Sequence, residues 1–206
     1  MKELLSKLLQ RIEEYAGEEQ FALALKEAKN NFFDQLGIPQ ENSESAELEL
    51  ANFIEWFIFD FPLEDGKRLW QKFLEEKQNE LEPIEKNALG DFSRQIYGLF
   101  EIKKILPEKA VVKELVSKKK FDPVYGLEVN LKAGDLVLAR VLNISGSLFF
   151  TNTFFYLPSE LKKFCRKKIR LVRKNKLPKE EFFKELKAIA IKSIRYPRMK
   201  LKELCR

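Results

Sequence analysis

The chain has 206 residues, of which 45% are hydrophobic and 34% charged, and its 38 Lys and Arg exceed its 32 Asp and Glu by six. It contains no His, so the commonest general base and transition-metal ligand is excluded. The two cysteines, Cys165 and Cys205, lie far apart, which excludes a zinc knuckle and a disulfide framework. Two free thiols are the simpler interpretation, and one bridge between them is the alternative. We expect no metal and no cofactor.

The high charge, the lack of His and the frequent Lys, Glu, Leu and Phe are typical of proteins from thermophiles. Residues 1–7 are amphipathic and lack the apolar core of a secretory signal. No apolar run is long enough to cross a bilayer. We therefore expect a cytoplasmic protein without a membrane partner.

Residues 1–98 are predicted to form a bundle of four or five helices. Apolar side chains recur at helical spacing through residues 1–37, with a break at Gly17 and an end at Gly37. Pro83 is well placed in the first turn of a later helix. That helix is expected to run on to Gly98, because apolar residues continue at the same spacing.

The segment 53–62 (Phe-Ile-Glu-Trp-Phe-Ile-Phe-Asp-Phe-Pro) is the most apolar and aromatic decapeptide of the chain. A helix that is apolar on every side is normally buried on every side. We expect this helix to lie at the centre of the bundle, capped by Ser43 or Ser45 and ended by Pro62, with Trp56 in the core.

The periodicity changes after Gly98 to short strands separated by turn residues, and the lysines at 118–120 are predicted to form a solvated loop. Such a pattern indicates a small barrel or a strongly bent sheet. The expected strands are 99–105, 110–116, 121–129, 135–141, 147–151 and 153–157.

Residues 160–206 are strongly basic, with 18 Lys and Arg against 5 Asp and Glu, whereas residues 1–159 hold 20 against 27. Clustered positive charge neutralises phosphates and releases counterions, which is the general source of nucleic-acid affinity. Three interpretations remain open: binding of RNA or DNA, packing against an acidic surface of the same chain or a partner, and a solvated surface. The candidate nucleic-acid-binding residues are Lys162, Lys163, Arg166, Lys167, Lys168, Arg170, Arg173, Lys174 and Lys176.

Asp60, Glu64 and Asp65 gather around Pro62 and could hold a divalent metal or act as acid and base, as in a metal-dependent phosphoesterase. A structural interpretation explains the same residue types. Asp60 would accept backbone hydrogen bonds at the turn, and Asp65 would cap the next helix. We favour the structural interpretation, because it needs no ligand.

Three short stretches, at 53–60, 98–101 and 134–135, carry a resemblance to a little-characterised group of bacterial proteins. That group is characterised by a Phe-x-Glu-Trp-Phe-x-Phe-Asp segment, a Gly-Leu-Phe-Glu start to a β region and a Gly-Asp turn. Some members end in a SEC-C-type zinc knuckle, whose Cys-x-Cys and His-Cys ligands are missing here. The resemblance implies no zinc and no activity.

The expected fold is therefore α+β, with an N-terminal helical domain (1–98), a small β domain (99–158) and a basic helical C-terminal segment (159–206). No catalytic motif is recognised, and we expect a binding protein rather than an enzyme. RNA is the expected ligand of the basic segment, and DNA, an acidic protein partner or self-association are the alternatives.

Overall fold

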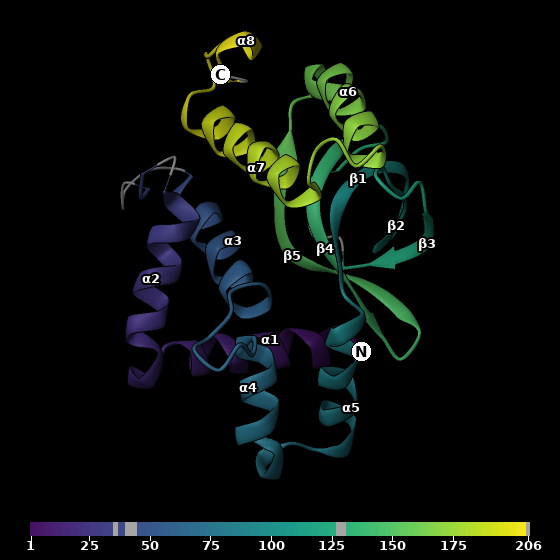
Figure 1. Ribbon diagram of the computed structural model, residues 1–206. Helices are drawn as coiled ribbons and strands as arrows, with labels where there is room; N and C mark the ends of the chain where they lie inside the picture. Colours follow the sequence, from purple (N-terminus) through teal and green to yellow (C-terminus); the bar gives the residue numbers. More distant parts are fainter. Residues whose placement is uncertain (35–36, 40–44, 127–130, 205–206) are drawn as a thin grey trace. The chain divides into compact units, whose positions relative to one another are not determined.

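The computed structural model describes residues 1–34, 37–39, 45–126 and 131–204, apart from the side chains of residues 152, 201 and 202. The chain forms two compact units (Figure 1). The first contains residues 1–94 together with 143–146, and the second contains residues 95–142 and 147–206. We call them the helical unit and the barrel unit. In sequence, the helical unit has 11 Lys and Arg against 21 Asp and Glu, and the barrel unit has 27 against 11.

The α+β fold class is confirmed, and the first 94 residues are helical. The first helix ends before Gly17 as expected, because the N–H of Gly17 bonds to carbonyls of its last turn. The second α-helix ends at Phe33, four residues before the expected end at Gly37, whose φ is +69°. The α-helices of this unit are α1 (Lys2–Ala16), α2 (Ala22–Phe33), α3 (Ala46–Phe59), α4 (Leu69–Glu76) and α5 (Pro83–Asp91), and the short 3-10 helices are η1 (Glu19–Phe21), η2 (Gln78–Glu80) and η3 (Phe92–Arg94).

Helix α3 supplies much of the aromatic core of the helical unit. Phe53 and Phe57 are buried, and Phe53 packs against Phe32 with ring centroids 5.5 Å apart. The expectation that α3 is buried on every side is wrong: Trp56 is half-buried and Leu50 is 37% exposed. Apolar residues occur on all sides of α3, so the sequence pattern does not indicate which side is exposed. Of the two predicted caps, Ser45 occupies the N-cap position without a side-chain capping bond, and Ser43 lies outside the described residues.

Helix α5 ends earlier than the spacing of apolar residues predicted. Pro83 occupies its first turn as expected, but the helix ends at Asp91. Residues Ile96 and Gly98 belong to a strand instead, because the backbone from Ile96 to Glu101 pairs with a strand some forty residues further along the chain. A local periodicity carries no information about such a distant partner.

Within the described residues, the barrel unit contains five strands where the sequence pattern predicted six. The two expected strands at 147–151 and 153–157 form one continuous strand, and residues 127–130 of another expected strand lie outside the described part. The strands are β1 (Ile96–Leu106), β2 (Lys109–Glu114), β3 (Lys120–Tyr125), β4 (Leu136–Ile144) and β5 (Ser147–Leu157).

These strands close in the order β1-β2-β3-β5-β4. Strand β1 pairs antiparallel with both β2 and β4, while β3 and β5 run parallel. This is the strand order of five-stranded Greek-key barrels of the OB type. The interior is filled by apolar side chains of alternate residues, including Phe100, Ile102, Val112 and Val137. Residues between them, such as Glu101 and Lys113, therefore face outward.

Helices α6 (Lys162–Arg173), α7 (Lys179–Arg195) and α8 (Leu201–Leu204) follow β5 and belong to the same compact unit as the barrel. The structure thus groups the expected second and third domains together and begins β1 two residues before the expected boundary at Gly98. In the described part of the chain, no helix is both long and apolar enough to cross a membrane. Cys165 is buried, and Cys205 is not among the described residues.

Candidate functional site

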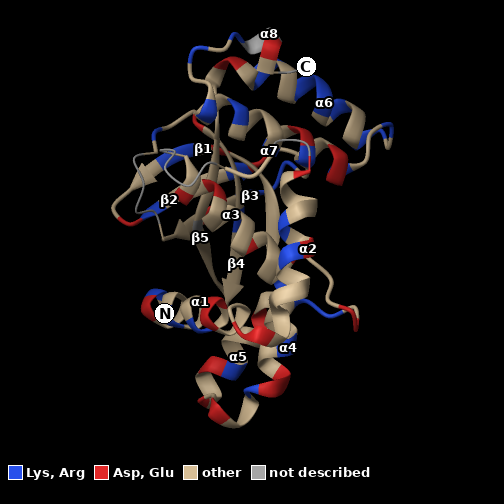
Figure 2. Cartoon of the chain, turned by 90° about the vertical axis from the view of Figure 1, so that its left-hand side faces the viewer, with Lys and Arg blue, Asp and Glu red and all other residues tan. Residues whose placement is uncertain are grey.

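Helix α6 divides into an apolar side and a basic side because its apolar residues recur at helical spacing. Cys165, Ile169 and Val172 are buried, and most of the intervening residues are Lys or Arg. Figure 2 shows these cationic positions in blue along α6. The apolar side packs within the barrel unit, and the cations next to it along the helix lie beside the barrel wall.

A cavity of about 280 Å³ lies between α6 and the outer face of the barrel. Four of its lining cations come from α6, and two come from the barrel strands and their loops. We call this cavity the basic cleft. Its lining residues are Glu101, Lys113, Leu115, Lys118, Leu136, Lys162, Cys165, Arg166, Ile169, Arg170 and Arg173.

Arg173 forms one end of the cleft and is held by the loop after β2. Its Nε donates a hydrogen bond to the carbonyl oxygen of Val116 at 2.8 Å, and its Nη2 donates to the carbonyl oxygen of Leu115. Both acceptors are backbone atoms, so the charge of the guanidinium is not neutralised by these contacts.

Lys162 lies next to the loop that precedes β4. Its Nζ is 3.4 Å from the position that a Cβ on Gly134 would occupy. Gly134 has a φ of +93°, a conformation that L side chains rarely adopt, and its N–H bonds to the carbonyl of Ile102. The absent side chain at this turn leaves room for the ammonium of Lys162 beside the barrel.

The cleft gathers six cations and a single carboxylate, that of Glu101. The Oε2 of Glu101 is 2.6 Å from the ammonium of Lys103, which lies outside the lining. Among the described residues, no carboxylate forms an ion pair with Lys113, Lys118, Lys162, Arg166 or Arg170. Like charges around one cavity repel one another, and a bound polyanion relieves that repulsion.

The nine predicted binding residues are thus separated by the structure into three sets. Four of them, Lys162, Arg166, Arg170 and Arg173, line the basic cleft. Lys168 instead pairs with Glu185 of α7 at 2.7 Å, and its ammonium lies 5.3 Å from the ring centroid of Phe164. The remaining four are exposed and outside the lining: Lys163, Lys167, Lys174 and Lys176.

Sequence reasoning missed the barrel side of the cleft. Lys118 was assigned to a solvated loop, and neither Glu101 nor Lys113 was proposed as a site residue. The β1–β2 register places Glu101 directly opposite Lys113. Alternation along the two expected strands would have placed both on the outer face, but nothing local to them indicates that a helix some fifty residues later covers that face.

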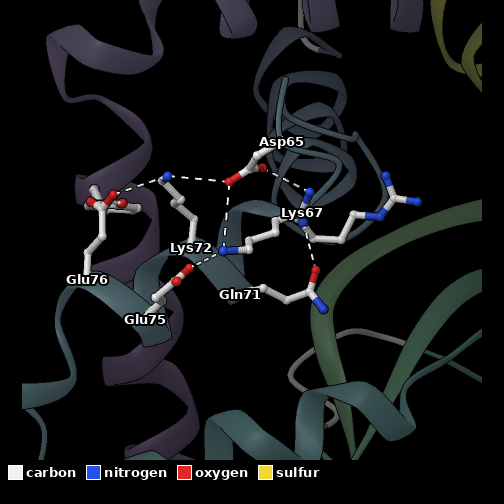
Figure 3. Close-up of polar contacts among 8 residues, drawn as sticks. Asp65, Lys67, Gln71, Lys72, Glu75 and Glu76 are labelled. Carbon is white, nitrogen blue, oxygen red and sulfur yellow. Dashed lines mark hydrogen bonds and ion pairs between the residues drawn. The ribbon is translucent and has the colours of Figure 1, made fainter.

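The alternative carboxylate site lies in the helical unit (Figure 3). Asp65 accepts the N–H of Lys67 at 3.0 Å and pairs with the ammonium of Lys72 at 3.4 Å. The bond from Lys67, followed by the contacts with Lys72, holds the pKa of Asp65 below its usual value. The prediction that Asp65 caps α4 is wrong, because Arg68 is the N-cap residue and its N–H bonds to Gln71 of the first turn.

The three carboxylates near Pro62 do not share a site. Glu64 and Asp65 line a second cavity of about 570 Å³, whose lining does not include Asp60. The N–H of Asp60 donates to the carbonyl of Trp56 at 2.8 Å and ends α3. Across the described residues, no three His, Cys, Asp or Glu side chains are arranged to hold a metal ion.

Comparison with known proteins gives one match. The model of a protein family described as "Family of unknown function (DUF7986)" matches residues 1–189. No curated protein and no solved structure matches the chain.

Proposed function

The chain belongs to this family of unknown function, and we propose that it is a non-enzymatic protein that binds single-stranded RNA through the basic cleft. The observation that carries the proposal is the gathering of six cations around one cavity between α6 and the barrel. Electrostatic contact with phosphates is the main source of sequence-independent nucleic-acid affinity.

The spacing of the cations on α6 suits a chain of phosphates. Lys162, Arg166 and Arg170 follow one another at intervals of four residues. Four residues of an α-helix rise about 6 Å, which is similar to the separation of neighbouring phosphates in an extended strand. Consecutive phosphates could therefore each meet one of these side chains.

The composition of the cleft favours the backbone of the nucleic acid over its bases. Proteins that hold unpaired bases usually stack them on aromatic rings. The lining of the cleft contains no aromatic residue. We therefore expect the phosphates and sugars to occupy the cleft and the bases to point away from it, so that sequence preference is weak.

The barrel supports the proposal only by analogy. Greek-key barrels of the OB type often bind oligonucleotides, with loops that here correspond to the turns at 107–108 and 145–146. The basic cleft lies instead beside the 115–118 loop and α6. A fold shared with binding proteins does not establish a function, and the charge of the cleft is the stronger argument.

The test is to measure the affinity for a fluorescein-labelled oligouridylate between 50 and 300 mM salt by fluorescence anisotropy. The affinity should fall with a log–log slope of roughly −0.7 for each phosphate contacted. Replacing both Arg166 and Arg170 by Ala should weaken binding of every sequence and make the slope shallower by about one to one and a half units.

The matched control replaces Lys167 and Lys174 by Ala. Both residues are exposed and outside the cleft, Lys167 on α6 and Lys174 at its C-cap position, and their replacement removes the same charge. The control should leave the slope nearly unchanged. Equal losses in the two double variants would contradict a role for the cleft. Salt-sensitive self-association without RNA would favour the alternative of a protein-interaction module.

A further inference from the structure

We propose that Glu101 selects RNA over DNA by accepting a hydrogen bond from a ribose 2′-hydroxyl in the basic cleft. This inference rests on the proposed function, because it assumes that a nucleic-acid backbone occupies the cleft. It concerns the single acidic residue of a lining that otherwise carries six cations and four uncharged residues.

A carboxylate is a disadvantage in a site for phosphates alone. Two like charges about 4 Å apart repel one another, and the repulsion is about four times as strong near a protein surface as in water. The charge of Glu101 therefore lowers the affinity for every phosphate close to it. Its position in the lining is explained by a ligand group that donates a hydrogen bond to a carboxylate.

Stability gives no sufficient reason for the carboxylate. Its ion pair with Lys103 joins side chains that are 24% and 41% exposed, and exposed pairs of this kind contribute little to folding. A carboxylate offers about four lone-pair sites for hydrogen bonds. The contact with Lys103 uses only part of them, so Glu101 can accept a further hydrogen bond. The pair with Lys103 instead holds the carboxylate on the outer face of β1.

The neighbouring residues indicate which donor Glu101 meets. Lys113 is directly opposite it across the β1–β2 ladder, and both line the cleft. A phosphate held by Lys113 would bring its own sugar within reach of Glu101. In RNA that sugar carries a hydroxyl donor beside the phosphate, and the 2′-hydroxyl is the group by which proteins distinguish RNA from DNA.

A donor on a base is the rival occupant. The lining offers no aromatic ring on which a base could stack. The Lys and Arg side chains of the lining attract the negative charge of phosphates. The cleft therefore attracts the backbone of the strand rather than the edges of its bases. The sugar hydroxyl is therefore the donor that the structure favours.

The experiment compares three labelled oligomers of uridine that differ only at the 2′ position: hydroxyl, hydrogen and methoxy. The wild-type protein should bind the hydroxyl form about tenfold more tightly than either of the others, a ratio that corresponds to about 1.4 kcal/mol. The methoxy oligomer keeps an RNA-like sugar but has no donor, so it separates hydrogen bonding from sugar shape.

Glu101→Ala should bring the three affinities to within about twofold of one another, chiefly by strengthening the two forms without the hydroxyl. Glu101→Gln removes the charge but retains a carbonyl acceptor, so it should keep part of the preference for the 2′-hydroxyl oligomer. If Glu101 acted through its charge alone, this variant would lose the preference entirely. Glu108→Ala is the matched control, because this carboxylate is exposed in the β1–β2 turn and outside the lining. It should leave the ratio unchanged.

The outcomes for the two proposals are distinct. Binding that needs Arg166 and Arg170 but shows equal affinity for the three oligomers would overturn the role of Glu101 and leave the proposed function standing. No salt-dependent binding of any oligomer would overturn the proposed function itself. A Glu101→Ala variant that changes the preference among bases, with the 2′ preference intact, would assign Glu101 to a base edge instead.

Discussion

The guanidinium of Arg173 in α6 donates a hydrogen bond to the backbone carbonyl of Val116 in the loop after β2, with a separation of 2.8 Å. Arg173 was predicted from sequence only as a nucleic-acid-binding residue. The structure gives it a second role, because a side chain that bonds two successive carbonyls also holds α6 against the barrel. Under the proposed function, Arg173 would serve both stability and phosphate binding.

Replacing Arg173 by Ala should lower the free energy of unfolding by about 1–2 kcal/mol, because two charge-assisted hydrogen bonds are lost at an exposed position. Urea unfolding followed by far-UV circular dichroism measures the change. Lys174→Ala is the control, since this neighbouring residue is exposed and outside the cleft, and it should change stability by less than about 0.5 kcal/mol.

Arg173→Lys separates the two roles of the residue. Lys keeps the positive charge but lacks the planar fork of donors that reaches both carbonyls. The Lys variant should therefore retain most of the salt dependence of RNA binding while losing stability nearly as much as the Ala variant. Full stability in the Lys variant would show that the two carbonyl contacts contribute little to holding α6.

Gly98→Ala should destabilise the barrel unit by about 1–3 kcal/mol, the usual cost of an overpacked core. A Cβ on Gly98 would lie 2.9 Å from Cγ of Glu114, which is closer than carbon atoms approach. Glu114 is buried and accepts the N–H of Val116 at 3.0 Å, so moving it disturbs the loop that borders the basic cleft.

The measurement is thermal unfolding of Gly98→Ala beside Gly90→Ala. Gly90 lies in α5, and a Cβ there would meet no atom within 4 Å. Because Ala has the higher helix propensity, Gly90→Ala should leave the melting temperature unchanged or raise it. A Gly98→Ala variant as stable as the wild type would mean that Glu114 can shift without cost.

Gly98 also shows how far sequence reasoning reaches in this fold. The helices and strands follow from periodicity and from turn residues, because these patterns report local burial. The end of α5 was misplaced because Ile96 continues the helical spacing, and only the ladder with β4 converts it to a strand. Pairing across some forty residues is not encoded in the local pattern.

The candidate site, like the fold, was predictable from sequence only where its residues are recognised by a local pattern. The basic character of α6 was evident from Arg166 and Arg170, whose charge needs no partner to be recognised. The contributions of Glu101 and Lys113 depend on which face of the barrel α6 covers, which is a tertiary fact. The basic helix could therefore be recognised from its excess of Lys and Arg in the sequence, whereas the cavity could be recognised only from the structure.

Replacing Phe57 by Ala should cost about 3–5 kcal/mol of stability, the usual range for a large buried aromatic residue. Phe57 is fully buried, whereas its neighbour Trp56 is only half-buried and contacts Phe32 and Phe61 at one side of α3. Trp56→Ala should therefore cost clearly less than Phe57→Ala. Urea unfolding of the two variants by circular dichroism measures this order, and a reversed order would place Trp56 at the centre of the core.

The helical unit should lose stability in acid because of carboxylates such as Glu85. Its Oε2 accepts the N–H of Glu82 at 2.9 Å, and its Oε1 lies 3.1 Å from the guanidinium of Arg11. The bond from Glu82 and then the charge of Arg11 hold the pKa of Glu85 below 4.5, its ordinary value. Asp91 behaves alike, because the N–H of Ser145 at 2.7 Å lowers its pKa.

A group whose pKa is lower in the folded than in the unfolded state stabilises the fold fully above its unfolded pKa. That contribution is lost as the pH falls through the folded pKa. Glu13 opposes the trend, since burial and then repulsion from Glu55 raise its pKa in the folded state. We expect the free energy of unfolding to fall from about pH 4.5 downward, because two of these three carboxylates, Glu85 and Asp91, have a lowered pKa in the folded state.

Both tryptophans, Trp56 and Trp70, belong to the helical unit, so their fluorescence during urea unfolding at a series of pH values reports on this unit. Glu85→Gln should lower stability at pH 7 and flatten the acid limb, because Gln cannot form the charged contact with Arg11. Glu27→Gln, at an exposed position on α2, should leave the profile unchanged. An acid limb of equal steepness in the Glu85 variant would assign the acid sensitivity to other carboxylates.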